Sequence, residues 1–191
     1  WDAAYELSQH VVKGFGLDLR GGTFTGPGFI VSTWAAWQSL CEVLLHQALP
    51  TRRIVGQLRW PLGRRGDEIV YARPDISVLY ESGAEYLLDA KYKTRLGKKP
   101  SIQSTDLYES LAFMRAAKTR YISLLYPSTR SIVDFPLGTC TVFDSVVVDE
   151  FHVDGVEVQL QGLAGKGGLS KLVQGVRGTL QTRAKAIITS R

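Results

Sequence analysis

The chain has 191 residues, of which 45% are apolar and 21% are charged, and its formal net charge is +5. A chain of this length buries one substantial core but not two, so we expect a single domain. No stretch approaches the ~18 uninterrupted apolar residues of a membrane helix, and no basic segment precedes an apolar one at the N-terminus. We therefore expect no membrane span and no signal peptide. The positive charge is compatible with nucleic acid but does not identify it.

The cysteine usage and the N-terminal composition set the expected organisation. Cys41 and Cys140 lie far apart without metal-site or disulfide spacing, which is typical of small buried side chains in a reducing compartment. We predict a cytoplasmic location. Residues 1–30 are expected to form a leading helix, over residues 2–14, and a glycine-rich segment, while residues 31–191 form the main domain. Because the sequence begins at Trp1 rather than Met, we expect it to be the C-terminal part of a longer chain.

The next elements are predicted from caps and from apolar spacing. Ser32 or Thr33 can cap a helix, apolar residues recur after it at helical spacing, and Pro50 ends it. Three strands are predicted over residues 54–60, 75–80 and 85–92, and a tight turn through Gly83 joins the last two. The intervening PLGRRGDE segment, residues 61–68, predicts a flexible basic loop.

The second half of the chain starts with a helix and an apolar strand. Ser104 or Thr105 can cap the helix, and YISLLY at residues 121–126 predicts a buried strand that Pro127 ends. This strand is expected to run parallel to the strand before the helix, through a right-handed crossover. Further strands are predicted over residues 140–149 and 156–161, and an amphipathic helix over residues 168–185.

Charged residues stand at the ends of two of the predicted strands. Side chains alternate across a strand, so Asp89 and Lys91 are expected on one face. If the connecting loop holds the three residues 82–84, Asp75 lies opposite Lys91 and diagonal to Asp89, within about 5–8 Å. A two-residue loop would instead turn Asp75 to the wrong face. Pro74 cannot donate to a ladder and marks the start of the strand or a bulge.

These residues have the chemistry of a metal centre. Asp75, Asp89 and the backbone carbonyl of Ala90 would supply the hard oxygen ligands that Mg²⁺ and Mn²⁺ prefer. The Lys91 ammonium would orient or help to deprotonate an attacking water and offset the charge that builds on a phosphodiester. The alternative is structural: Asp89 and Lys91 form a salt bridge at a strand end, and the Pro-Asp pair is a turn.

The sequence also resembles a known group of nucleases. The Pro74-Asp75 pair, thirteen further residues and then Asp89-Ala90-Lys91 resemble the PD-(D/E)xK signature. The predicted element order resembles the restriction-endonuclease-like core, an α/β fold (αβββαβ) with a mixed central sheet flanked by helices. More specifically, GLDL at 16–19, DAKYK at 89–93, DLYESLAF at 106–113 and SLLYP at 123–127 resemble the McrC family, the nuclease subunits of McrBC 5-methylcytosine-specific restriction systems. The resemblance covers residues 2–127.

One position departs from the family pattern. The family has a glutamate directly after an aromatic residue of the first helix, and here Gln38 follows Trp37. An amide oxygen can ligate a metal or hold a water, but it carries no charge and cannot act as a base. Two alternatives stay open: Gln38 substitutes for the glutamate, or Glu42, one turn later, takes over. For Glu109, contact with the attacking water and exposure to solvent are equally open.

The resemblance implies a Mg²⁺-dependent DNA endonuclease, in which Mn²⁺ is able to substitute. Its catalytic residues would be Asp75, Asp89, Lys91 and Gln38, with Asp75, Asp89 and the Ala90 carbonyl as metal ligands. Basic side chains of the neighbouring loops would hold DNA phosphates, which gives affinity without sequence information. These DNA-binding residues are Arg64, Arg65, Lys93, Arg95, Lys98 and Lys99.

The resemblance also implies partners. Double-stranded DNA, with or without methylation, would be the substrate, and an McrB-like AAA+ GTPase would supply recognition and translocation. GLAGKGGLSK at residues 162–171 lacks the spacing of a phosphate-binding loop, so we expect no nucleotide on this chain. Two alternatives remain. One is a nuclease-fold module that binds DNA or assembles with partners without cutting, and the other is a repair or recombination nuclease of the same fold.

Overall fold

The computed structural model describes residues 32–80, 83–92 and 100–189. The leading helix and the glycine-rich segment predicted for residues 1–30 lie outside these residues. Within the described part of the chain, no helix is both long and apolar enough to cross a membrane.

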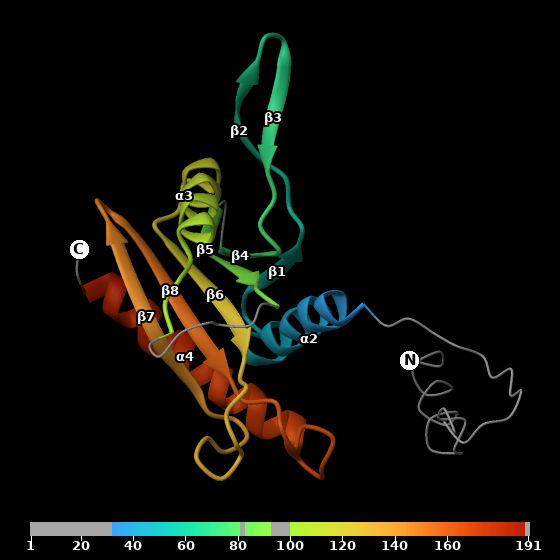
Figure 1. The fold of residues 1–191 in the computed structure, drawn as a ribbon. Helices are drawn as coiled ribbons and strands as arrows, with labels where there is room; N and C mark the ends of the chain where they lie inside the picture. The colour runs from blue at the N-terminus through green and yellow to red at the C-terminus, as the bar shows by residue number, and fades with distance from the viewer. Residues whose placement is uncertain (1–31, 81–82, 93–99, 190–191) are drawn as a thin grey trace, which may run out of the picture. The chain divides into compact units, whose positions relative to one another are not determined.

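A six-stranded mixed sheet forms the centre of the fold (Figure 1). Its strand order is β1-β4-β5-β6-β8-β7, in which β5, β6 and β8 run parallel and the other neighbours pair antiparallel. The strands are β1 (Arg53–Gly56), β4 (Ile76–Tyr80), β5 (Gly83–Ala90), β6 (Tyr121–Pro127), β7 (Cys140–Val148) and β8 (Phe151–Val158). The predicted α/β class with a mixed central sheet is confirmed, as is the parallel pairing of β5 with β6.

Helices cover both faces of this sheet. On one side α2 (Thr33–Ala48) and α4 (Gly168–Thr189) pack over a core that contains Leu88 of β5. On the other side α3 (Ser104–Ala117) packs over a core that contains Leu87. Because side chains alternate along β5, Asp89 shares the α3 side with Leu87. The strand period therefore decides which helix faces the acids.

The segment that the sequence predicted as a flexible loop forms a second sheet. It is a hairpin of β2 (Trp60–Arg65) and β3 (Glu68–Ala72). The turn uses Gly66, whose φ of 60° suits glycine, and β3 carries the strand-favouring sequence Ile69-Val70-Tyr71. The strand predicted for residues 54–60 ends early, at Gly56, because Gln57 adopts a left-handed conformation with φ 53°.

The predicted register between β4 and β5 was wrong by two residues. Tyr80 pairs with Gly83, so the connection holds two residues rather than three. A bulge between Val78 and Leu79 then shifts the pairing, and Ile76 lies opposite Leu88. Continued by one residue, this register sets Asp75 beside Asp89 rather than beside Lys91. The bulge restores the alternation that a two-residue turn alone would have broken, so the acids still share a face.

Candidate metal centre

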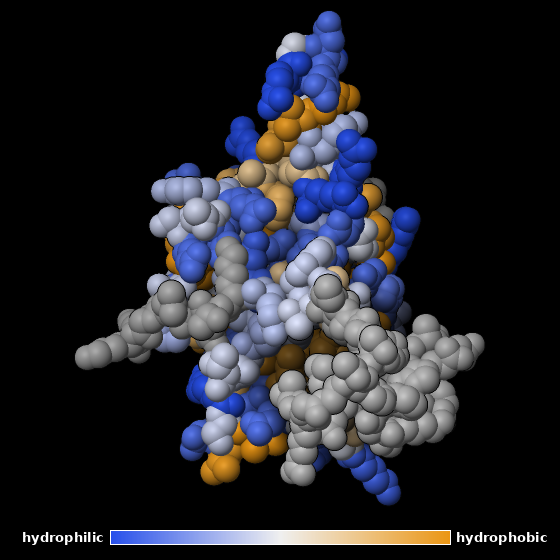
Figure 2. Space-filling model, turned by 45° about the vertical axis from the view of Figure 1, so that its right-hand side comes forward, coloured by the Kyte–Doolittle hydropathy of each residue, from blue (hydrophilic) through white to orange (hydrophobic). Residues whose placement is uncertain are grey.

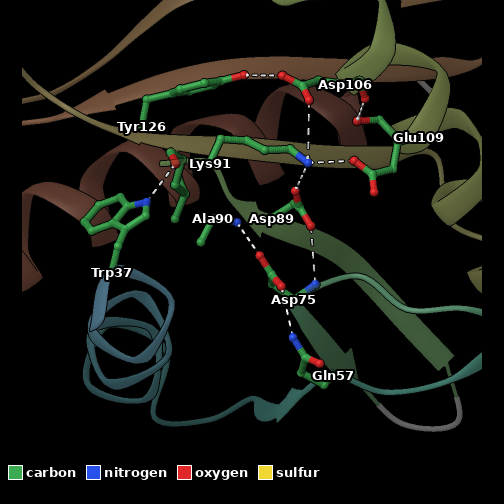
Figure 3. Close-up of polar contacts among 11 residues, drawn as sticks. Trp37, Gln57, Asp75, Asp89, Ala90, Lys91, Asp106, Glu109 and Tyr126 are labelled. Atoms are coloured by element: carbon green, nitrogen blue, oxygen red, sulfur yellow. Dashed lines mark hydrogen bonds and ion pairs between the residues drawn. The ribbon is translucent and has the colours of Figure 1, made fainter. Parts of the chain in front are cut away.

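Asp75 and Asp89 meet where β4 begins and β5 ends (Figure 3). The Asp75 backbone N–H donates to Asp89 Oδ1 over 3.4 Å, and the Ala90 N–H donates to Asp75 Oδ2 over 2.9 Å. In an extended strand the N–H and C=O of one residue point to the same side, so the Ala90 carbonyl is directed toward Asp75 as well. The two carboxylates therefore meet at one strand end, with the Ala90 backbone beside them.

Gln57 is a member of this site that the sequence did not reveal. Its Nε2 donates to Asp75 Oδ1 over 3.1 Å, and its backbone N–H donates to the Asp75 carbonyl over 2.7 Å. Gln57 immediately follows β1, and every residue of β1 pairs with a residue of β4. No local sequence pattern pointed to Gln57, because the strand was predicted to continue to residue 60.

The two carboxylates destabilise each other's charge. Burial, together with the negative charge of Asp89, raises the pKa of Asp75 to about 6. Burial also raises the pKa of Asp89, and the attraction of Lys91 only partly opposes that effect. A pair of this kind gains most when a cation neutralises it, because both desolvation and mutual repulsion are then relieved.

Lys91 lies at the centre of an acidic cluster. Its Nζ lies 2.5 Å from Asp89 Oδ2, 2.7 Å from Glu109 Oε2 and 3.7 Å from Asp106 Oδ1. Burial alone would lower the Lys91 pKa, but the ion pairs with Asp89 and Glu109 outweigh it and hold the pKa above its ordinary value. Lys91 is therefore a cation in this structure, and Glu109, which the sequence left open, contacts Lys91.

Asp106 fixes the far side of that cluster. It is almost completely buried at the start of α3, and its Oδ2 accepts a hydrogen bond from the Tyr126 hydroxyl over 3.3 Å. Burial and the neighbouring Asp106 raise the Tyr126 pKa, so the phenol stays a donor. In the sequence, Asp106 stood out only as the first residue of the stretch DLYESLAF. The structure adds that Asp106 holds one side of Lys91 through its carboxylate.

Helix α2 approaches the same strand ends. Trp37 Nε1 donates to the Leu125 carbonyl over 3.1 Å, and the same carbonyl accepts the Lys91 N–H over 2.9 Å. Gln38 is half-buried, and no hydrogen bond within the described residues joins it to either aspartate. The Glu42 carboxylate lies against β1, since a methyl group on Gly56 would fall 2.7 Å from Glu42 Oε1.

The donor set fits a hard divalent cation. Among the described residues no group of three or more His, Cys, Asp or Glu side chains has metal-site geometry. Asp75, Asp89 and the Ala90 carbonyl would therefore leave the remaining positions to water, which suits Mg²⁺ because it retains several waters. Among the described residues of this site, several carboxylates surround one ammonium, that of Lys91. This excess of negative charge favours the binding of a cation.

The predicted DNA-binding residues divide into two groups. Arg64 and Arg65 lie exposed on β2, in the hairpin. Lys93, Arg95, Lys98 and Lys99 lie outside the described residues, so their prediction stands untested.

The fold and the site together define an α/β domain with paired carboxylates at adjacent strand ends of a mixed sheet. No family model matches the chain, and no curated protein matches its sequence. The structure is similar to a chain of a refined half-complex from a tetradecameric assembly of Thermococcus gammatolerans McrB AAA+ hexamers with bound McrC. The TM-score is 0.55 and the identity 17%, over 80% of this chain and 34% of the other. The chain thus spans about a third of that neighbour, and the similarity shows a shared fold.

Proposed function

We propose that the chain is the nuclease domain of an McrC-like restriction subunit, built on a restriction-endonuclease-like core and hydrolysing phosphodiester bonds of DNA with Mg²⁺. The observation that carries the proposal is the convergence of Asp75, Asp89 and Lys91 on one face at the ends of β4 and β5. The similarity to a chain of an McrB–McrC assembly supports the same reading at the level of the fold.

The residues divide the chemistry between them. A Mg²⁺ ion held by Asp75, Asp89 and the Ala90 carbonyl would polarise a phosphate oxygen and acidify a bound water. Lys91, held as a cation by Asp89 and Glu109, would lie beside the phosphate and offset the charge that develops on it. Cleavage would leave 5′-phosphate and 3′-hydroxyl ends. Because the Lys91 pKa is raised, Lys91 would act through its positive charge rather than as a base. It could release a proton only if metal binding first weakened its ion pairs with the neighbouring carboxylates.

The partners follow from this role. The substrate would be double-stranded DNA, methylated or not, and an McrB-like AAA+ GTPase would recognise and translocate it. No nucleotide site is proposed on this chain, and its location would be cytoplasmic.

A second candidate rests on α2. The position where the family has a glutamate is Gln38, and Gln38 makes no hydrogen bond to either aspartate within the described residues. A domain with this change would bind DNA or assemble with its partner and not cut. Metal binding with no cleavage under any partner condition would favour it.

Calorimetric titration of Mn²⁺ tests the site before any cleavage assay. We expect binding by the wild type and its loss in Asp75→Asn and Asp89→Asn, because each substitution removes one anionic ligand. Asp134→Asn is the matched control, since Asp134 is exposed in another part of the chain. If the wild type binds no metal, even with duplex DNA present, the nuclease proposal fails. If it binds, plasmid cleavage with a GTPase partner, compared with Lys91→Met, separates the two candidates.

A further inference from the structure

The β2–β3 hairpin, with its flanking residues 58–74, forms an arm that starts and ends at the candidate metal centre. Gln57 precedes the arm and Asp75 follows it, and the two hydrogen bonds between them close its base. Trp60 also anchors it, because its Nε1 donates to Ser77 Oγ over 3.1 Å. Trp60 thereby fixes the base of the arm on the sheet.

The two faces of the arm have different surroundings. The pair of Trp60 and Ala72 packs into the α3 core, and Ala72 is buried there. The next pairs with side chains on the opposite face are Pro61 with Tyr71 and Arg64 with Ile69. Ile69 and Tyr71 are 43% and 41% exposed. We call Arg59, Arg64, Ile69 and Tyr71 the outer face.

Charge identifies the kind of partner that this outer face suits. Residues 59–73 contain four arginines against Asp67 and Glu68. The Arg59 guanidinium stacks over the Tyr71 ring at 4.2 Å, and among the described residues no carboxylate pairs with it. Figure 2 shows the arm rising from the molecule, with hydrophilic side chains at its end and apolar ones below them. A surface of exposed arginines, an aromatic ring and aliphatic groups complements DNA phosphates and bases.

We propose that the outer face of this arm binds duplex DNA in its major groove and thereby sets which phosphate reaches Asp75 and Asp89. The proposal rests on the nuclease function proposed above and names the surface that orients the substrate. A two-stranded ribbon of this length extends about 20 Å and fits a groove about 12 Å wide. Since the base of the arm is hydrogen-bonded to Asp75, a duplex held by the arm has a fixed offset from the carboxylates.

The test is fluorescence anisotropy of the full chain with a labelled duplex of about 30 base pairs, in Ca²⁺ to prevent cleavage. The arm variant is Arg59→Ala/Arg64→Ala/Tyr71→Ala. The control variant, Arg52→Ala/Arg120→Ala/Tyr80→Ala, removes the same residue types elsewhere, including a second arginine stacked on a tyrosine at 4.2 Å. We expect the arm variant to bind at least ~30-fold more weakly with a salt slope lower by about 2, and the control to change less than ~3-fold.

Folding is checked by thermal melting and by Mn²⁺ titration, which both variants should pass. Arg64→Glu is a second arm variant that changes only one exposed side chain near the turn, and we expect at least ~10-fold weaker binding. If both arm variants bind the duplex like the wild type, or if the control loses as much affinity, the arm proposal is overturned and the metal centre is unaffected. If the arm variants still bind the duplex but no longer bind the purified GTPase partner, the arm is a protein-docking element and the proposal is wrong. If the wild type binds no duplex, the proposed function fails together with it.

Discussion

Gln57 donates a hydrogen bond from Nε2 to Asp75 Oδ1 over 3.1 Å, although its backbone adopts a left-handed conformation with φ 53°. Non-glycine residues enter that region at some cost, so the contacts to Asp75 must hold Gln57 there. The relationship joins a strand end, an arm and a candidate metal ligand at one point. A change at Gln57 should therefore be felt both in stability and at the metal.

Gln57→Ala should weaken the site without unfolding it. The variant loses the side-chain hydrogen bond, and we expect a loss of about 1 kcal/mol in the free energy of unfolding. Mn²⁺ affinity should fall several-fold, because Asp75 keeps its bond from Ala90 but loses the one that orients its other oxygen. Urea unfolding and calorimetry measure the two effects, with Gln174→Ala on the exposed side of α4 as control. Unchanged metal affinity would show that Gln57 only shapes the backbone.

The stability of the metal-free protein should fall as the pH rises through the range in which Asp75 ionises. Its folded pKa, about 6, lies above its ordinary 3.8, so the folded state holds the proton more tightly than the unfolded state. The stabilisation is therefore complete below about pH 4 and is lost by about pH 6. Asp75→Asn removes this dependence and should be about 1 kcal/mol more stable than the wild type above that range, after allowance for solvent screening.

The measurement is urea unfolding in EDTA from about pH 4 to about pH 8, for the wild type, Asp75→Asn and Asp134→Asn. The decisive quantity is the difference between wild type and variant, because acids that do not interact with Asp75 contribute equally to both. A difference that stays constant over the whole range would contradict the raised pKa of Asp75.

Lys91→Met should show whether Lys91 only neutralises the neighbouring acids or is also needed for metal binding. The substitution leaves Asp89, Glu109 and Asp106 without their shared cation, and we expect a loss of about 2 kcal/mol in the free energy of unfolding without metal. Mn²⁺ should still bind, and should restore more stability than in the wild type, since it then relieves more repulsion. Cleavage, where the wild type shows it, should fall by at least ~100-fold. Thermal melts with and without Mn²⁺ measure this, with Lys166→Met as control. Loss of metal binding would instead make Lys91 a structural support of the carboxylates.

Local sequence signals were sufficient for most elements. The helix predicted from a cap at Ser32 or Thr33 to a stop at Pro50 is Thr33–Ala48, and the strand predicted at 121–126 is Tyr121–Pro127. The last helix, predicted over 168–185, is Gly168–Thr189. These elements carry strong periodicity or apolar runs bounded by proline or glycine, which are properties of neighbouring residues alone.

The errors share a physical cause, which is dependence on distant parts of the chain. PLGRRGDE is rich in glycine and charge, and it becomes a strand and a turn because the Trp60 side packs against α3. The alternation of side chains predicted correctly that Asp75 and Asp89 share one face. It did not predict their register, because that depends on a bulge between Val78 and Leu79, which tertiary packing sets. Asp106 and Gln57 are likewise members of the site only through contacts that no local pattern encodes.

Two glycines of α4 should respond to alanine in opposite directions. A methyl group on Gly175 would fall 1.6 Å from the Gly138 carbonyl oxygen, so the helix or the 138 loop must move. We expect Gly175→Ala to lose about 2 kcal/mol or more in the free energy of unfolding. A methyl group on Gly178, one turn later, meets no heavy atom of the described residues within 4 Å. Because alanine restricts the unfolded chain and favours helix, Gly178→Ala should gain about 0.5–1 kcal/mol.

This pair tests how closely α4 packs on the sheet face opposite the metal centre. Both substitutions add the same methyl group to the same helix, so helix propensity cancels in their difference, which we expect to be about 3 kcal/mol. Urea unfolding at one pH measures it. Mn²⁺ affinity should stay unchanged in Gly178→Ala, since the proposed ligands lie at the ends of β4 and β5. A Gly175→Ala protein as stable as the Gly178→Ala protein would mean that α4 does not contact the Gly138 carbonyl, and that the core beneath it is looser than the structure shows.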